Sequence, residues 1–264
     1  MHWLIASVVL TVSTGCGRWG FGLPDVDAGR DSDAMTSCTP GPDLVGYWPF
    51  DEASGDTVTD YSNHGQSGDV IGDAAWASGR IGSALVFGGI DGEVALRSTS
   101  GLDFGQGSAS FTITYWLNPT TLTSPTQIRP LEIAYCVGTA YIFTDVRPDG
   151  TVTFGGYDGA GNHAYTDSTA GAIEVGSWVH VAHVLDRIAK IGRTYVNGAL
   201  SPGREDLSKW AGAIDCSTAT YAANIGGWNA FRYAGRIDDV RIYSRALSAG
   251  EVDQISRLTT SSCL

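Results

Sequence analysis

Hydrophobic and polar residues alternate with a period of two along much of this chain. In the segment SFTITYWLN, Ser110–Asn118, the odd-numbered residues from Phe111 to Leu117 are hydrophobic or aromatic, and the even-numbered ones are two threonines and Trp116. Successive side chains of a β-strand point to opposite faces of the sheet. The segment is therefore predicted to be a strand with one face in a core and the other face half exposed.

Eight further segments show this alternation or a high density of β-branched and aromatic residues. They are Val45–Phe50, Ala84–Phe87, Glu93–Leu96, Tyr141–Val146, Thr151–Tyr157, Trp178–Leu185, Arg193–Gly198 and Ile237–Tyr243. Turn-forming residues stand between them, such as PDG at Pro148–Gly150 and NG at Asn197–Gly198.

One short helix is predicted near the end of the sequence, in SAGEVDQISRL. Ser248 can cap the helix, and Glu251 stands three residues later, as in a capping box. Many short antiparallel strands with a single helix predict an all-β fold of two packed antiparallel sheets.

Length and charge narrow the classes of function. The 264 residues, 43% of them hydrophobic, suffice for one substantial core but not for two ordinary domains and a tail. The formal net charge is −12, and Lys190 and Lys209 are the only lysines. Nucleic acids and anionic membranes are bound by clustered Lys and Arg, so the composition argues against both partners.

The N-terminus has the pattern of an export signal. The apolar run WLIASVVLTV, Trp3–Val12, is too short for a membrane-spanning helix, which needs roughly 20 residues. Small residues then precede Cys16 in STGC, which resembles the lipobox of bacterial lipoproteins, although Ser13 replaces the usual leucine and only His2 stands before the run. We expect residues 1–16 to be a signal peptide and Cys16 to be acylated; a plain secretory signal is the alternative.

The predicted domain organisation follows from this signal. Residues 17–42 are rich in Asp, Gly, Ser and Pro without apolar periodicity, which indicates a flexible acidic tether. The folded domain is expected over residues 43–264. By analogy with lipoproteins, Gly17 after the cysteine favours the bacterial outer membrane or cell surface; without acylation the protein would be secreted or periplasmic. The membrane would be a partner only through the lipid anchor.

Four cysteines follow Cys16, an even number that in an exported protein suggests two disulfides. Three pairings are possible. We expect Cys38 to pair with Cys263, because the termini of a sandwich domain often lie together, which leaves Cys136 with Cys216.

Six segments resemble, in family order, the laminin G-like branch of the concanavalin A-like jelly rolls found in bacterial surface proteins. They are GYWPFDEASGDTVTDYSNHG, GSALVFGGIDGEV, SFTITYWLNP, SWVHVAHVLD, TYVNGAL and GRIDDVRIYSRALSAGEV. The resemblance implies a two-sheet antiparallel jelly-roll sandwich, frequently with a structural calcium ion, that binds glycans or partner proteins at cell surfaces.

A calcium site is the first expectation from the resemblance. Calcium prefers six to eight oxygen ligands from carboxylates, amides and carbonyls. If the first and last strands pair, as the resemblance implies, Asp51, Asp60 and Asn63 converge on Asp238. Related jelly-roll glycosidases hold a calcium at the position of Asp238. These four residues are the predicted calcium ligands.

Alternation separates the two adjacent aspartates of the last strand. Asp238 is predicted to share the core face with Val240, whereas Asp239 is predicted to be a surface or ion-paired residue. A carboxylate on the core side needs a cation or several donors. The alternative to calcium is a salt bridge from Asp238 to Arg236 or Arg245, together with capping of backbone amides.

No enzyme activity is predicted. Jelly-roll glycosidases carry Glu-x-Asp-x-x-Glu on a strand, and the nearest segment, EVDQIS, lacks the last glutamate and lies on the predicted helix. His180 and His183 are three residues apart on a predicted strand and so face opposite ways; His180 is expected to be a packed structural residue. His64 and His163 are placed in loops without evident partners.

Aromatic residues beside glycine-rich loops are the candidates for ligand binding, because sandwich proteins bind sugars with exposed aromatic faces and a few polar groups. Tyr157 follows GG, and Trp228, Phe231 and Tyr233 lie in NIGGWNAFRY. The predicted ligand-binding residues are Trp228, Tyr157 and Tyr233; the alternative is that these rings close the core.

The sequence therefore predicts a non-catalytic cell-surface binding module for a carbohydrate or a surface protein. The alternatives are a divergent glycoside hydrolase and a purely structural envelope lipoprotein.

Overall fold

The structure is a computed structural model that describes residues 39–98, 109–123, 128–133, 140–203, 205–210, 212, 214 and 223–263. The chain divides into two units, 1–31 and 32–264, and every described residue belongs to the second. The predicted signal peptide, Cys16 and most of the predicted tether lie outside the described residues. In the described part of the chain, no helix is long and apolar enough to cross a membrane.

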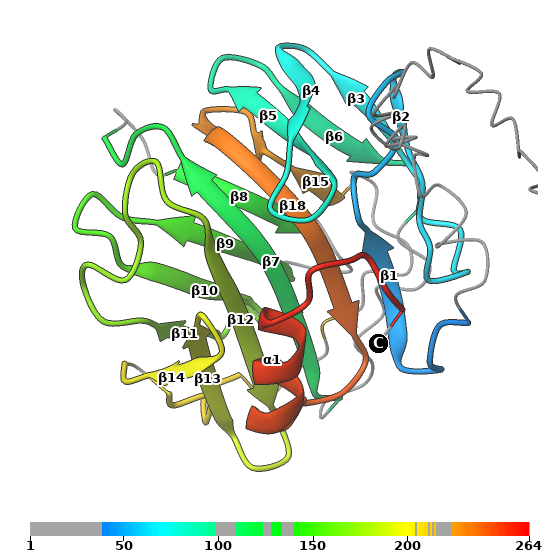
Figure 1. Ribbon diagram of the computed structural model, residues 1–264. Coiled ribbons are helices and arrows are strands. Elements are labelled where there is room, and N and C mark those ends of the chain that lie inside the picture. The colour runs from blue at the N-terminus through cyan, green and yellow to red at the C-terminus, as the bar shows by residue number, and fades with distance from the viewer. Residues whose placement is uncertain are drawn as a thin grey trace, which may run out of the picture. The chain divides into compact units, whose positions relative to one another are not determined.

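One antiparallel sheet, sheet A, has the strand order β14–β13–β12–β7–β18–β5–β4, with β1 also paired to β18 (Figure 1). Its strands are β1 (Leu44–Trp48), β4 (Ala74–Ser78), β5 (Ser83–Gly88), β7 (Phe111–Pro119), β12 (Val179–Asp186), β13 (Ile191–Val196), β14 (Ala199–Ser201) and β18 (Ala234–Tyr243). The long strand β18 pairs with β5 along its first half and with β1 along its second. The first and last strands of the domain therefore pair.

The other antiparallel sheet, sheet B, has the order β11–β10–β9–β8–β15–β6–β3–β2. Its strands are β2 (Thr57–Val58), β3 (Gly68–Ile71), β6 (Glu93–Leu96), β8 (Ile128–Ile133), β9 (Tyr141–Val146), β10 (Val152–Tyr157), β11 (His163–Asp167) and β15 (Ala223–Ile225). A small hairpin of β16 (Gly227–Trp228) and β17 (Phe231–Arg232) follows β15 and lies against β8.

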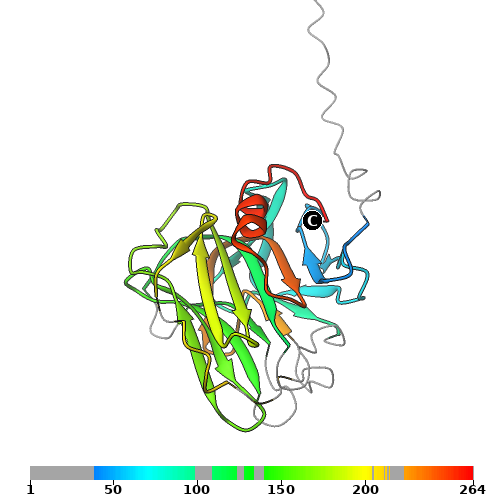
Figure 2. The same ribbon diagram turned by 90° about the horizontal axis from the view of Figure 1, so that it is seen from below.

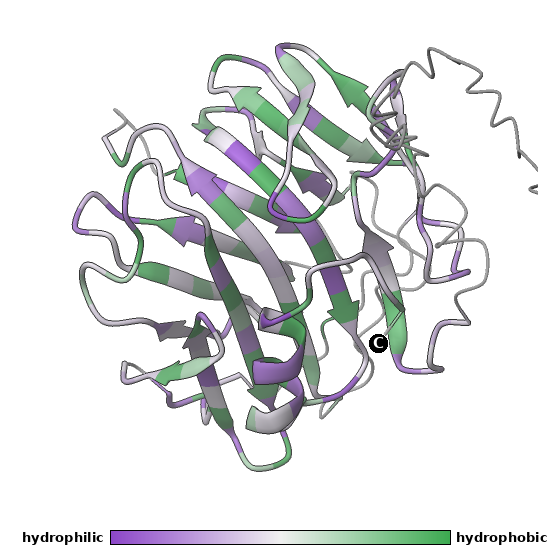
Figure 3. Cartoon of the chain, viewed as in Figure 1, coloured by the Kyte–Doolittle hydropathy of each residue, from purple (hydrophilic) through white to green (hydrophobic). Residues whose placement is uncertain are grey.

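Sheets A and B enclose the main hydrophobic core between them. Phe111 and Leu117 of β7 point into it from sheet A, and Ile142 and Phe154 from sheet B. Figure 3 shows the alternation of hydrophobic and hydrophilic positions along β18. The predicted all-β sandwich of two antiparallel sheets is confirmed.

A second hydrophobic cluster covers the outer face of sheet A. Val252 and Ile255 of helix α1 (Ala249–Ser256) pack there with Tyr47 and Tyr243, and Figure 2 shows α1 on the side of sheet A that faces away from sheet B. The threonines and Trp116 of β7 are consequently buried. The expectation of a half-exposed face on this strand is wrong, because alternation within β7 cannot reveal a cover supplied by the C-terminal segment.

Helix α1 begins as predicted. The Ser248 hydroxyl accepts the Glu251 N–H at 3.3 Å, and a Glu251 carboxylate oxygen accepts the Ser248 N–H at 2.7 Å. All nine predicted strand segments overlap a strand of the structure, whereas β8 and β11 are among those that the sequence did not predict.

Candidate functional site

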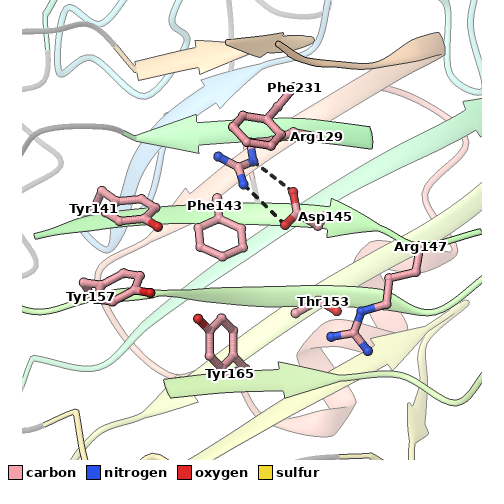
Figure 4. A pocket seen from close by; sticks show the side chains of 9 residues that line it. All are labelled: Arg129, Tyr141, Phe143, Asp145, Arg147, Thr153, Tyr157, Tyr165 and Phe231. Carbon is pink, nitrogen blue, oxygen red and sulfur yellow. Dashed lines mark hydrogen bonds and ion pairs between the residues drawn. The ribbon is translucent and has the colours of Figure 1, made fainter. Parts of the chain in front are cut away.

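A pocket of about 380 Å³ lies on the outer face of sheet B, away from the main core. Alternate residues of β8 to β11 line it, together with Phe231 of the hairpin (Figure 4). The lining residues are Arg129, Tyr141, Phe143, Asp145, Arg147, Thr153, Tyr157, Tyr165 and Phe231. The residues between them, such as Ile142 and Phe154, fill the core. The alternation that builds the core thus also gathers these side chains on one surface.

Aromatic rings form a continuous array in the pocket. Tyr141 and Tyr157 are register partners on β9 and β10, and their rings stack with centroids 5.0 Å apart. Phe143 lies 5.5 Å from Tyr141 and 6.2 Å from Tyr165, again between centroids. Tyr165 has room above β10 because residue 155 is glycine, where a Cβ atom would lie 2.1 Å from the ring. Such an array offers apolar ring faces beside phenolic hydroxyls.

A buried arginine stands at the hairpin side of this array. The Arg129 guanidinium lies 4.3 Å from the ring centroids of both Phe143 and Phe231, and is sandwiched between them. It donates to Asp145 at 2.9 Å and also to Glu132. Burial raises the pKa of both carboxyl groups, and the charge of Arg129 opposes the rise. Arg129 therefore holds the two carboxylates and the two rings in one rigid cluster.

Polar groups with few partners lie further along the same strands. The Thr153 hydroxyl is buried and has no hydrogen-bond partner. The Arg147 guanidinium is about 40% exposed, and its Nη2 is 3.5 Å from Asp167 Oδ1, a long contact. The Arg147 guanidinium therefore remains able to donate to a ligand, whereas the Thr153 oxygen is enclosed.

The three predicted ligand-binding residues have different surroundings. Tyr157 lines the pocket, and Trp228 is on the hairpin strand β16, outside the pocket lining. Tyr233 is fully buried, packs against Phe87 and donates its hydroxyl to the Arg236 carbonyl at 3.0 Å. The structure corrects the prediction for Tyr233, which closes the core and has no ring face left for a ligand. Ligand binding by Tyr157 and Trp228 stays a prediction.

Most of the pocket was not predicted from the sequence. Tyr141, Phe143 and Asp145 occur at every second position of β9, and the intervening residues are buried. This alternation of an aromatic and charged face with a core face was a usable signal. The partners Arg129 and Tyr165 lay on strands that were not predicted, so the grouping could not be seen.

Asp238, the central residue of the predicted calcium site, lies on sheet A instead. A bulge at Asp239, where φ is 51°, shifts the pairing of β18 with β7. Asp238 therefore pairs with Trp116 on the outer face, whereas Val240 lies in the main core. The prediction that Asp238 and Val240 share a face is wrong, because one extra residue reverses the alternation. Asp239 is also buried and pairs with Arg241 at 2.9 Å, so it is an ion-paired residue and not a surface one.

Asp238 is fully buried with one oxygen free of partners. Its Oδ2 accepts the N–H groups of Arg80 at 2.7 Å and Ile81 at 2.9 Å, and its Oδ1 has no hydrogen-bond partner. Burial raises the pKa of Asp238 to about 8, and the charges of Asp239 and Asp51 add to the rise, against the effect of the two amides. A buried carboxyl group with a free oxygen is a fitting place for a cation.

The other three predicted calcium ligands fit less uniformly. Asp51 is close enough to Asp238 to influence its charge, and accepts hydrogen bonds from Ser83 N–H and the Ser261 hydroxyl. Asp60 uses both carboxylate oxygens for backbone N–H groups of its own loop and of β1. Asn63 is exposed. Among the described residues, no group of three or more His, Cys, Asp or Glu side chains could hold a metal ion.

The predicted alternative, a salt bridge from Asp238 to Arg236 or Arg245, is not found among the described residues. Arg245 pairs with Asp43 at 2.9 Å and with Glu251 at 2.6 Å. None of the ion pairs between described residues involves Arg236. Of the alternative to calcium, only the capping of backbone amides is found at Asp238.

Two histidines of β12 are packed in the structure. His183 contacts Phe154 and Tyr115 in the main core, and His180 contacts Trp116 on the other face. Burial lowers the pKa of His180 to about 4 and that of His183 to about 3. Both are neutral structural residues at pH 7.

His64 and His163 were both predicted to lie in loops. His64 contacts Ser62. His163 belongs to β11, where its ring lies 5.5 Å from Tyr157 and 5.6 Å from Tyr165 between centroids. It therefore extends the aromatic array, in contrast to the expectation that it lacks partners.

Of the cysteines, only Cys263 is described, and it is disulfide-bonded. Cys38, Cys136 and Cys216 all lie outside the described residues. The partner of Cys263 is therefore not identified by the structure, and the pairing stays a prediction.

Comparison with known proteins gives a family match and several similar folds. The model of the concanavalin A-like lectin/glucanases superfamily matches residues 87–253. No curated protein matches the sequence.

Similar solved structures include the binding domain of Paraclostridial mosquitocidal protein 1, with 16% identity over 81% of this chain and a TM-score of 0.64. Domain 4 of the arabinanase AbnA from Geobacillus stearothermophilus, in complex with arabinotriose, has 21% identity over 81% of this chain and a TM-score of 0.59. The ligand-binding domain of botulinum neurotoxin serotype D, in complex with N-acetylneuraminic acid, has 13% identity over 84% and a TM-score of 0.57. This chain spans about half of the two toxin domains (52% of each) and 98% of the arabinanase domain. At these identities the likeness shows the fold.

Proposed function

The chain belongs to the concanavalin A-like lectin/glucanases superfamily, and from this fold and its pocket we propose that it is a non-catalytic module that binds carbohydrate on the outer face of sheet B. The aromatic array of Tyr141, Phe143, Tyr157 and Tyr165 carries the proposal. Sugar rings have apolar faces that pack on aromatic side chains, and their hydroxyls hydrogen bond to polar groups at the edges of such a site. The arabinanase domain in complex with arabinotriose and the toxin domain in complex with N-acetylneuraminic acid support this choice of ligand class.

Glycan-array screening of the folded domain, followed by calorimetry on any positive sugar, tests the proposal. Tyr157→Ala should weaken binding at least tenfold, because it removes a ring from the centre of the array, whereas Tyr157→Phe keeps the ring and should lose much less. Arg257→Ala, a change at an exposed residue of the C-terminal segment, is the matched control and should bind normally. Binding that is equally strong in Tyr157→Ala would move the site elsewhere, and a domain that binds no glycan would favour a surface protein as ligand or a purely structural role.

A divergent glycoside hydrolase is the second candidate, because Glu132 and Asp145 are carboxylates with raised pKa near the pocket. Retaining hydrolysis needs one carboxylate as nucleophile and another as free acid. Here a single guanidinium, that of Arg129, binds both groups, which argues for a structural role. Incubation with polysaccharides and measurement of new reducing ends decides: release that Glu132→Gln abolishes would establish an enzyme.

We also propose that a structural calcium, where bound, is held by Asp238 and Asp51. The free Oδ1 of Asp238 and the proximity of Asp51 support this pair, whereas Asp60 serves the backbone of its loop. Calcium at this place would be the positively charged partner that the Asp238 carboxylate otherwise lacks. Titration calorimetry with calcium on chelator-treated protein tests this pair of ligands.

Acylation at Cys16, with placement at the bacterial outer membrane or cell surface, completes the proposal. Labelling of cells with an alkyne-bearing fatty acid should mark the wild-type protein and leave Cys16→Ser unmarked. An unlabelled wild-type protein in the medium or periplasm would indicate the plain secretory signal.

A further inference from the structure

The β16–β17 hairpin divides the outer face of sheet B. It lies against β8, and its Phe231 ring covers the Arg129 guanidinium at 4.3 Å. On its far side, Arg232 pairs with Glu93 of β6 at 2.8 Å. The hairpin is thus anchored on both sides of β15, and it stands between the pocket and the half of the sheet formed by β6, β3 and β2.

The pocket is open in the other direction across the sheet. The order β8–β9–β10–β11 ends at β11, which is an edge strand of sheet B. Neighbouring strands are about 4.8 Å apart, so the distance from β8 to β11 is ~14 Å. A ligand that crosses the strands meets Phe231 at one end and leaves the surface over Tyr165 and His163 at the other.

The charged groups of the site are paired before any ligand binds. Arg129 is shared by Asp145 and Glu132, and Arg147 faces Asp167. When Glu132 and Asp167, which pair with the arginines of the pocket but do not line it, are counted, three carboxylates oppose two arginines, and the whole chain carries a formal charge of −12. An anionic ligand would meet this excess of negative charge, whereas neutral hydroxyl groups can use Arg147 as a donor and the Tyr157 hydroxyl as a donor or an acceptor.

We infer that this site takes the end of a neutral glycan chain, with the terminal sugar against Phe231 and the rest of the chain leaving over β11. This inference rests on the proposed carbohydrate binding. It further specifies a short footprint, a neutral ligand and the hairpin as the wall that sets the footprint.

Calorimetry with chains of defined length tests the inference. The probes are xylo-, arabino-, manno- and cello-oligosaccharides of one to six residues, with oligogalacturonides of the same lengths as the acidic series. For the neutral series that binds, we expect affinity to rise to about three residues and then stay within twofold up to six. The acidic series should bind at least tenfold more weakly.

The hairpin variants identify the wall. Phe231→Ala should let affinity keep rising beyond three residues, because the chain can then continue past β8. Asn229→Gly, a change at an exposed turn residue of the same hairpin whose φ of 51° suits glycine, should keep the wild-type plateau.

Each outcome has a distinct meaning. If neither these probes nor any glycan of the array binds, the proposed function fails and the inference fails with it. If a neutral series binds with affinity that rises steadily to six residues, or if Phe231→Ala keeps the plateau, carbohydrate binding stands and the end-binding inference is overturned. Equal or stronger binding of oligogalacturonides overturns the neutral ligand.

Discussion

Asp238 is a carboxyl group in a place where a negative charge is costly. Its folded-state pKa of about 8 lies above the ordinary value of 3.8. Between about pH 4 and pH 8 the folded protein therefore keeps a proton on Asp238 that the unfolded chain has already released. Stability must therefore fall as pH rises through that window, by up to about 1.4 kcal/mol per pKa unit of difference. A cation beside Oδ1 would reverse this penalty by stabilising the ionised form.

Asp238→Asn separates these two states. The amide oxygen can still accept the N–H groups of Arg80 and Ile81, but no charge is buried. In chelator at pH 8 we expect the variant to be more stable than the wild type by ~2 kcal/mol or more, with the difference shrinking toward pH 4. Urea unfolding across that pH range measures it, and a variant less stable than the wild type at pH 8 in chelator would contradict the expectation.

Calcium should change the sign of that comparison. If Asp238 and Asp51 hold the ion, added calcium raises the melting temperature of the wild type and leaves that of Asp238→Asn unchanged. Titration calorimetry on chelator-treated protein gives the independent measurement. No heat and no change of melting temperature in the wild type would remove calcium from the proposal.

The sequence predicted that Asp238 would be buried, but neither the face on which it lies nor the burial of Asp239. Asp238 was singled out by alternation, and the bulge at Asp239 puts it on the opposite face from the expected one. A bulge follows from the pairing of β18 with β7, β5 and β1 together, so a single strand's pattern could not show it. Asp51 could be assigned to the same neighbourhood only through the pairing of β1 with β18.

Single elements were predictable where their causes are local. The capping box of α1 depends on two residues three positions apart, and it forms as expected. The pocket depends on four neighbouring strands in register. Only β9 and β10 were predicted, because β8 contains the polar Arg129 followed by Pro130, and because His163, the first residue of β11, was assigned to a loop. The pocket could therefore not be predicted from the sequence, although the alternation of pocket-facing and core-facing residues along β9 could be recognised.

The N-cap of helix α1, Ser248, contributes to the stability of the helix. Ser248→Ala removes the cap and leaves the first-turn N–H groups without that acceptor, so the free energy of unfolding should fall by about 1 kcal/mol. Ser248→Asp, which retains a capping oxygen, is the matched control and should recover most of the loss. Urea unfolding at pH 7 is the measurement, and an unchanged midpoint in Ser248→Ala would show that packing of Val252 and Ile255 alone fixes the helix.

The C-terminal end of the domain lies beside its first strand, β1. Cys263 is disulfide-bonded and packs against the outer cluster that contains Leu44, the first residue of β1. Just before it, Ser262 N–H donates to the hydroxyl of Tyr47 on β1 at 3.2 Å. Cys38 precedes Leu44 by six residues, a reach of at most ~20 Å. These contacts favour Cys38 as the partner over Cys136 or Cys216.

Mass spectrometry of a non-reduced digest should therefore find a peptide that joins Cys38 to Cys263, and another that joins Cys136 to Cys216. Because the first disulfide would close nearly the whole domain into one loop, its removal should cost roughly 5 kcal/mol by the chain-entropy account. The double variant Cys38→Ser with Cys263→Ser measures this in urea without touching the other pair. A linkage of Cys263 to Cys136 or Cys216 would contradict the pairing, whereas the expected linkage with an unchanged unfolding midpoint would mean that β1, β18 and the C-terminal segment hold the ends together without the bond.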